Sequence, residues 1–435
     1  MDLDKLPFSF RILIYKSLII GTAVLLCVFD PYTVPADTIK IGLNYPETGP
    51  YAAQGLDQRR AVDLAVEEMN AAGGILNHRI EIVVRDTASD PREAVVNATE
   101  MIDKFGVKMI LGGVSSGVAV AMSDLCQEKG MLFMATITAS NATTGEHGHR
   151  HTFRVSYNAW MGAKAMSSFL KSRFSGKKYF YVVSDYTWGW SSEASIRKFT
   201  GTEDISYHKR VLTPLGANEE VFKKAVNLAA LVKPDVLVLV LFGQDMSTAI
   251  RLATLAGLKK NAQIIVPILE LALAEGAGPK VMEGVIGTSD WNWSVPYEYG
   301  YTRGQTFIER FISRFKRYPS WGASTAYTNM WEYKQAAERV GTFDIPAIIK
   351  SLEGHKFTLL ADEKQWRDFD HQVVQSVYIV RCKPQSQVLK DPMQLDYFEI
   401  LQKIPGDAVV QTRNEWNQRR LKAGLPPKLE KLPGE

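Results

Sequence analysis

Apolar and polar positions follow a regular series along residues 37–266. Short apolar runs alternate with segments in which apolar residues recur every three or four positions, and these patterns predict strands and helices, respectively. Strands that alternate with helices are typical of parallel sheets with crossover helices, so the series predicts an α/β fold. Outside residues 111–140, the runs that we expect to be strands are 39–45, 79–85, 178–184, 205–211, 236–242 and 263–266.

Residues 111–140 form the most informative unit of this series. An apolar strand ends in the turn 114–117, a helix follows, and a second apolar strand runs into the Ser/Thr-rich turn 137–140. In a parallel sheet both turns leave at the carboxyl edge, where open α/β proteins bind small molecules. Ser115 and Ser116 would open the helix, where hydroxyls and free backbone N–H groups favour an anion such as a carboxylate.

The pattern starts again after this unit and indicates a second core. The later apolar strands are continuous enough to be buried on both faces, as in a separate lobe. Beyond about residue 284 the chain changes to aromatic-rich helical segments, and the tail from Lys383 contains one strand-like run, 396–401. We expect a chain that builds two lobes and then continues to return to both, and several crossings would form a hinge.

The first 36 residues differ from the rest of the chain. Arg11 and Lys16 precede an apolar run at 17–29, and residues 34–36 (Val-Pro-Ala) are small enough for signal peptidase. A retained membrane anchor is the alternative, but the run is shorter than the roughly 18 to 20 apolar residues that a spanning helix needs. The sequence therefore predicts export, with the mature chain starting near Asp37.

Composition and charge restrict the function classes. The chain has 46% hydrophobic and 23% charged residues, as globular proteins have, and its net charge of +4 comes without a long basic run. Nucleic acid is therefore not expected as a partner. Export would permit a disulfide, and whether Cys126 and Cys382 pair stays open at this point.

The turn GVSSG, residues 113–117, also matches the G-x-S-x-G nucleophile elbow of serine hydrolases. A hydrolase would need an acid and a later histidine, and the candidates are His208, His355 and His371. The pattern is short and common by chance, and anion binding through Ser116 explains the same residues without a general base. Anion binding is thus the favoured interpretation, and the hydrolase is the enzyme alternative.

A second group, in the loop GEHGHRH, could hold a transition metal through imidazole and carboxylate groups. It consists of Glu146, His147, His149 and His151. A solvated connecting loop is the more common outcome for such spacing, so we predict no metal site. No GxGxxG, Walker A, CxxC or HExxH pattern occurs, and no cofactor is expected.

Aromatic residues near the predicted loop ends could form the apolar walls of a cleft around an organic ligand. They are Tyr51, Trp188, Trp190, Trp291, Trp293 and Trp321. Asp245 and Glu270 each follow an apolar strand and could pair with a ligand ammonium, although Asp245 could equally cap its helix.

Four segments together resemble the solute-binding proteins of branched-chain amino-acid type ABC transporters, with the periplasmic binding fold of type I. These segments are IKIGLNYPETGPYAAQG, AVEEMNAAGGI, RDTASDPREAVVNA and ILGGVSSG, and the likeness continues through SDYTWG and WRDFDHQ. The resemblance implies two Rossmann-like lobes with parallel sheets, joined by a hinge of three crossings. It implies lobe 1 at 37–156 plus about 288–375, and lobe 2 at 157–287 plus about 376–435.

The resemblance also implies the residues that contact the ligand. The serine that receives the ligand carboxylate corresponds to Ser116, beside Ser115, and the next loop corresponds to Ile137, Thr138 and Ser140. The residue after the TGP turn is Gln54 or its neighbour Tyr51. The second lobe would contribute Trp188, the segment from Phe242 to Asp245, and Glu270 as the ammonium partner.

Two departures from the family pattern concern the ligand. Leucine/isoleucine/valine-binding members carry a cysteine pair where this chain has Ser89 and Ser115, and several aliphatic pocket positions are tryptophan here. The WRDFDHQ run resembles branches assigned to amides, urea or aromatic carboxylates.

The sequence therefore predicts a periplasmic, monomeric binding protein that delivers a small carboxylate-bearing solute to a membrane permease. A ligand sensor shares the same features.

Overall fold

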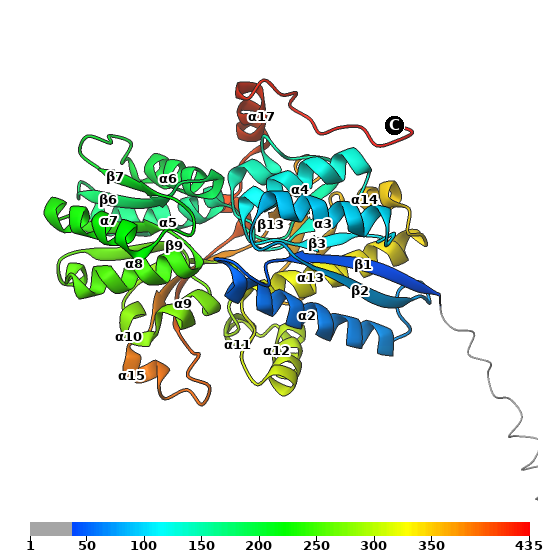
Figure 1. Ribbon diagram of the computed structural model, residues 1–435, viewed down its shortest axis with the longest axis horizontal. Coiled ribbons are helices and arrows are strands. Elements are labelled where there is room, and N and C mark those ends of the chain that lie inside the picture. The colour runs from blue at the N-terminus through cyan, green and yellow to red at the C-terminus, as the bar shows by residue number, and fades with distance from the viewer. Residues whose placement is uncertain (1–36) are drawn as a thin grey trace, which may run out of the picture. The chain divides into compact units, whose positions relative to one another are not determined.

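The computed structural model describes residues 37–435 (Figure 1). The predicted signal segment lies outside the described residues. In the described part of the chain, no helix combines the length and the hydropathy needed to cross a membrane.

The first sheet has five parallel strands in the order β2-β1-β3-β4-β5. Its strands are β1 (Thr38–Tyr45), β2 (Arg79–Asp86), β3 (Ile110–Gly112), β4 (Phe133–Ala135) and β5 (Thr152–Arg154). Adjacent residues of each central strand enter different cores, since Ile110 and Phe133 pack in one hydrophobic cluster and Leu111 and Met134 in the other. Helices therefore cover both faces of this sheet, as expected for parallel strands.

The helices of this lobe pair across and beside the sheet (Figure 1). They are α2 (Ala52–Ala71), α3 (Pro91–Asp103), α4 (Ser116–Lys129), α12 (Thr302–Phe315), α13 (Trp321–Val340) and α14 (Ile345–Leu352). Helix α3 begins where Asp90 accepts hydrogen bonds from the N–H groups of Arg92 and Glu93, and α4 ends at Gly130 in the left-handed conformation. Helix α2 packs against α13, and α3 against α4.

The second sheet has seven strands in the order β15-β14-β10-β9-β8-β6-β7. Strands β6 to β10 are parallel, whereas β14 and β15 are antiparallel to their neighbours. The strands are β6 (Tyr179–Ser184), β7 (Arg210–Thr213), β8 (Val236–Val240), β9 (Gln263–Ile268), β10 (Ile286–Ser289), β14 (Val377–Cys382) and β15 (Phe398–Ile404). The predicted strand 205–211 is mostly wrong, because only its end joins β7 and Ile205 is exposed.

Helices α5 to α10 accompany this second sheet, and short elements complete the chain. The helices are α5 (Ala159–Phe174), α6 (Thr187–Thr200), α7 (Glu219–Val232), α8 (Gly243–Leu255), α9 (Leu271–Ala277) and α10 (Pro279–Met282). The short elements are η2 (Asn141–Thr144), η3 (Leu258–Lys260), α11 (Val295–Glu298), α15 (Gln385–Val388), α16 (Gly406–Val409), α17 (Arg413–Lys422), and the small antiparallel sheet of β11 (Lys356–Phe357), β12 (Lys364–Trp366) and β13 (Val373–Val374). The parallel first sheet and the mostly parallel second sheet confirm the predicted α/β fold in two lobes.

The chain passes between the two lobes after β5, after β10 and between β13 and β14. One carboxylate joins these three crossings. Asp290 Oδ2 accepts hydrogen bonds from the Tyr157 N–H at 3.1 Å and from Gln375 Nε2 at 2.9 Å. Burial raises the pKa of Asp290 to about 6.

The C-terminal tail departs from the expected boundaries. Residues 376–435 were expected in lobe 2, and β14 and β15 do pair in the second sheet. Helix α17, however, packs on the connection between β4 and β5: Trp416 Nε1 donates to the Thr144 carbonyl at 2.7 Å, and Arg419 pairs with Glu146. Helix α17 therefore contacts the first lobe, and its buried residues there are Trp416 and Arg420.

Candidate functional site

A pocket lies between the carboxyl ends of the parallel strands of the two lobes. The turns after β3 and β4 and the start of α13 form one side, and the segments after β6 and β8 and the end of β9 form the other. The free volume is about 210 Å³. The pocket is lined by Val114, Ser116, Ile137, Ala139, Tyr186, Trp188, Phe242, Ile268 and Trp321.

The N-terminus of α4 opens at the first-lobe side of this pocket. Ser115 is the N-cap residue, and its side chain makes no capping hydrogen bond. Ser116, which is 1% exposed, lines the pocket and accepts a hydrogen bond from the Ser140 N–H at 3.0 Å. The first-turn N–H groups and the Ser116 hydroxyl thus form a positive, hydrogen-bonding end that suits an anion.

The next loop, residues 137–140, divides its groups between the pocket and the opposite lobe. Ile137 and Ala139 line the pocket, and the buried Thr138 hydroxyl has no hydrogen-bond partner among the described residues. The Ser140 hydroxyl instead lies 2.8 Å from Thr187 Oγ1 and 3.0 Å from Ser191 Oγ, both on α6. The structure therefore makes Ser140 a contact between the lobes.

Aromatic rings form the second-lobe side. Trp188 and Phe242 pack edge to face with ring centroids 6.1 Å apart, and Tyr186 lies beside Trp188. Tyr51 contacts Phe242, and its hydroxyl lies 2.9 Å from that of Tyr186, so the two lobes touch here. Burial raises the pKa of Tyr51 well above its ordinary value, which keeps its phenol neutral.

Glu270 lies near the pocket but does not line it. Its carboxylate caps α9 by accepting from the N–H groups of Ala272 and Leu273, at 2.9 and 2.6 Å, and it also accepts from Gln54 Nε2 at 3.2 Å. Burial raises its pKa to about 7. Gln54 and Glu270 thus form a further contact between the lobes.

Asp245 is also set apart from the pocket walls. Its carboxylate accepts a hydrogen bond from the Gly216 N–H at 2.9 Å, on the loop before α7, and burial raises its pKa to about 6. Of the predicted site residues, the structure brings Ser116, Ile137, Trp188 and Phe242 together as pocket walls. Ser115 and Thr138 are chain neighbours of wall residues, and Tyr51 packs against Phe242.

A family model described as "Periplasmic binding protein" matches residues 38–387. The chain belongs to this family. The expected relationship is thereby confirmed, and the family is one of binding proteins rather than of enzymes.

The chain is similar to known binding proteins over most of its length. The leucine-, isoleucine-, valine-, threonine- and alanine-binding protein of Pseudomonas aeruginosa is 26% identical over 76% of this chain and 86% of its own. A periplasmic binding protein from Burkholderia mallei has a TM-score of 0.78 at 23% identity, covering 87% of this chain and 98% of its own. A solute-binding protein from Rhodopseudomonas palustris, in complex with 3,4-dihydroxybenzoic acid, has a TM-score of 0.72 at 17% identity, covering 85% and 98%. The two solved structures show the shared fold.

Within residues 37–435, the three candidate histidines form no catalytic triad with the serines of the turn 113–117. His208 accepts from the Tyr179 N–H, His355 contacts Arg339, and His371 contacts Glu353. Among residues 37–435, no hydrogen bond joins a histidine to Ser115 or Ser116. The family and this geometry both favour anion binding over catalysis.

The loop GEHGHRH, residues 145–151, forms ion pairs with helix α4 and with the C-terminal tail. His149 lies between Glu430, at 2.7 Å, and Asp124, at 3.0 Å, and these partners raise its pKa to about 9. The described residues contain no cluster of three or more such side chains arranged to hold a metal ion.

Sequence reasoning missed several walls of the pocket. Trp321 is among the aromatic residues that the sequence predicts as cleft walls, whereas Tyr186, within the SDYTWG segment, is not. Val114, Ala139 and Ile268 are ordinary apolar residues whose place at strand ends was their only signal.

Cys126 and Cys382 are both buried and, within the described residues, unpaired.

Proposed function

We propose that this protein is the substrate-binding component of an ABC importer, acting outside the cytoplasm after export. It captures a small carboxylate-bearing solute, an amino acid or a related organic acid, in the pocket between its lobes. It then delivers this solute to membrane permease subunits. Its family and the name of its Pseudomonas aeruginosa relative support this role.

One observation carries the proposal: a single pocket combines an anion-binding end with an aromatic wall. Ser116 and the start of α4 supply hydrogen-bond donors from the first lobe, whereas Trp188 and Phe242 supply rings from the second. Trp188 Nε1 is buried without a partner among the described residues, so a donor remains available to a ligand. Such convergence of a few polar groups in an apolar pocket is typical of small-molecule sites.

The contacts between the lobes suit capture by hinge closure. The pairs Tyr51–Tyr186, Gln54–Glu270 and Ser140–Thr187 each join groups of opposite lobes. A hinge opening would separate these groups, so a ligand that touches both sides stabilises the closed form and shifts the population towards it.

The pocket walls favour a ring-bearing acid as a second candidate beside an aliphatic amino acid. Four of the nine lining residues are aromatic and none is acidic. Glu270, the expected partner of an ammonium group, is occupied by two backbone N–H groups and by Gln54.

Four matched probes separate these ligand classes: L-leucine, 4-methylpentanoate, L-phenylalanine and 3-phenylpropanoate. They vary the ring and the ammonium independently, and each is added to the purified mature protein in thermal-shift and calorimetric titrations. A ligand that binds the native state raises the melting temperature. Tightest binding of 3-phenylpropanoate supports the ring-bearing acid, and tightest binding of L-leucine supports the amino acid. The absence of binding by all four contradicts carboxylate capture.

A further inference from the structure

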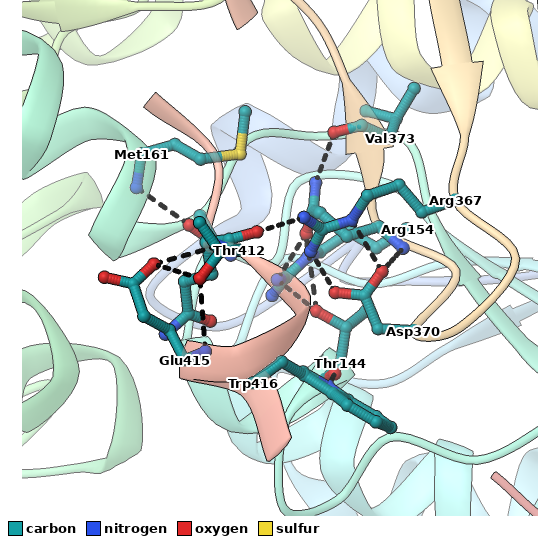
Figure 2. Close-up of polar contacts among 12 residues, drawn as sticks. Thr144, Arg154, Met161, Arg367, Asp370, Val373, Thr412, Glu415 and Trp416 are labelled. Atoms are coloured by element: carbon teal, nitrogen blue, oxygen red, sulfur yellow. Dashed lines mark hydrogen bonds and ion pairs between the residues drawn. The ribbon is translucent and has the colours of Figure 1, made fainter. Parts of the chain in front are cut away.

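Arg154 is a buried cation directly behind the pocket, at the end of β5. Its side chain is fully buried, yet no ion pair joins it to a carboxylate within the described residues. The negative charge of Asp370 favours the charged form of Arg154, but the Asp370 carboxylate is itself paired with Arg367 (Figure 2). Burial lowers the pKa of Arg154 to about 9, so the guanidinium remains charged at neutral pH. A buried cation without a direct anionic partner is costly and needs a physical reason.

All of the hydrogen bonds from this guanidinium go to neutral oxygens, and most of these belong to the loop that forms the pocket. Nη1 donates to the carbonyls of Thr138, at 3.3 Å, and of Ser140. Nη2 donates to Thr144 Oγ1 at 2.7 Å, and Nε donates to Gln372 Oε1 at 2.7 Å. Figure 2 shows Arg154 beside Thr144, which Trp416 of α17 contacts from the other side. Arg154 therefore fixes the loop 137–144 from behind.

This arrangement fixes one peptide group of the loop that forms the pocket. In a trans peptide the carbonyl and the next N–H point in opposite directions, and the Thr138 carbonyl is held by Arg154 and by Ser156 Oγ. The following N–H, that of Ala139, is directed away from Arg154. Ala139 lines the pocket, and within residues 37–435 no protein acceptor takes its N–H. The buried Thr138 hydroxyl in the same loop also has no partner there.

We propose that Arg154 is a positioning residue that gives the pocket its preference for an anion. It holds the Thr138 and Ser140 carbonyls so that the Ala139 N–H is presented to the ligand carboxylate, and its positive charge lies behind that peptide group. The ligand carboxylate supplies the anion that Arg154 lacks among its direct partners. This inference rests on the proposed capture of a carboxylate in this pocket.

A purely structural role for Arg154 makes a different prediction, and the ratio of affinities for an acid and its amide separates the two roles. The probes are 3-phenylpropanoate with 3-phenylpropanamide, and L-leucine with L-leucinamide, each titrated calorimetrically. Arg154→Gln is expected to lower the acid-to-amide ratio by roughly tenfold or more, since a nearby unit charge acts through a low effective dielectric. Arg154→Lys keeps the charge and should keep most of the ratio while weakening both ligands.

Arg197→Gln is the matched control. Arg197 is also a buried arginine that binds carbonyls, those of Thr202 and His208, but it pairs with Glu193, and none of its hydrogen bonds reaches the loop 137–144. Its loss should leave the acid-to-amide ratio unchanged. An unchanged ratio in Arg154→Gln, or an equal loss in the control, overturns the inference.

A measurement on the wild-type protein covers the case in which the Arg154 variants do not fold. The carboxyl carbon of the bound acid is labelled with ¹³C and titrated by NMR. A nearby cation and N–H donors should keep the bound carboxyl ionised to lower pH than the free acid. A bound pKa that is unchanged or raised contradicts the inference. Equal wild-type affinity for acid and amide also contradicts it but leaves solute capture intact, whereas no binding of any probe contradicts the proposed function itself.

Discussion

The two sides of the pocket offer different kinds of contact to a ligand. The first-lobe side offers backbone N–H groups, the Ser116 hydroxyl and the start of α4, all held by hydrogen bonds behind the loop. The second-lobe side offers the rings of Tyr186, Trp188 and Phe242, which contact one another and Tyr51. One side is built mainly from main chain and the other from side chains.

This difference separates the recognition of charge from the recognition of shape. A backbone N–H remains whatever side chain the residue carries, so the first-lobe side should accept a carboxylate in any related sequence that keeps the loop. The rings can be exchanged singly without moving the backbone, so the shape of the ligand body should depend on the second lobe. We therefore expect substitutions of Ser116 to affect all acids alike and substitutions of Trp188 to affect them selectively.

The double change Ser116→Ala with Trp188→Ala removes a group from each side and should have the largest effect. Losing a hydrogen bond to a charged group costs about 1.5–3 kcal/mol, and truncating a buried aromatic anchor costs about 2 kcal/mol or more. Affinity for the tightest of the four probes should thus fall by about a thousandfold. Calorimetry measures this, with circular dichroism to verify folding.

Two single changes provide the comparison. Trp188→Ala alone should weaken 3-phenylpropanoate more than 4-methylpentanoate, whereas Trp190→Ala, which truncates a side chain 52% exposed on the same helix, should change neither. If the double variant keeps wild-type affinity, the assignment of the pocket is wrong.

Glu270→Gln tests the contact between the two sides through its pH dependence. The pKa of Glu270 is raised from 4.5 to about 7 in the folded protein, so the folded state holds this proton more tightly than the unfolded state. Its ionisation therefore destabilises the fold above pH 7, and this loss disappears as the pH falls towards 4.5. The variant, which is neutral throughout, should gain stability relative to wild type at pH 8 compared with pH 5.

Urea unfolding at the two pH values measures this difference. Glu220→Gln, a change at an exposed site on α7, should show no such pH-dependent gain. An equal difference between Glu270→Gln and wild type at pH 5 and pH 8 would show that burial does not control the ionisation of Glu270.

The sequence predicted the first-lobe side better than the second. The strand-turn-helix pattern at 111–117 predicts where Ser116 lies, because the carboxyl ends of parallel strands share one edge. It does not predict that Ser140 bonds to α6 or that Glu270 caps α9, since these roles depend on how closely the lobes approach. The contacts of α17 depend on the fold in the same way, because periodicity indicates which face of a helix is buried but not which element that face packs against.

Trp416→Phe tests whether this tail helix supports the first-lobe side. The change keeps an aromatic ring at this position but removes the 2.7 Å hydrogen bond from the indole Nε1 to the Thr144 carbonyl. The free energy of unfolding should fall by about 1–3 kcal/mol, because the carbonyl loses its buried donor. Ligand affinity should fall only a few-fold, since Thr144 also contacts Arg154. Lys422→Ala, at an exposed position of α17, is the control and should change neither quantity.

Treatment of the protein with a reducing agent should have the smallest effect on its stability. This result would exclude a covalent link between the two sides of the pocket. Cys126 lies on α4, whose start forms the first-lobe side, and Cys382 lies on β14 of the second sheet; both are buried, and neither forms a disulfide within the described residues. Removing a native disulfide typically costs about 2–5 kcal/mol, so its absence predicts the same melting temperature with and without dithiothreitol. Burial raises the pKa of both thiols, so iodoacetamide should modify them only after unfolding, which mass spectrometry can detect. A melting temperature several degrees lower under reduction would indicate that a covalent link, rather than hydrogen bonds and rings alone, joins the two lobes.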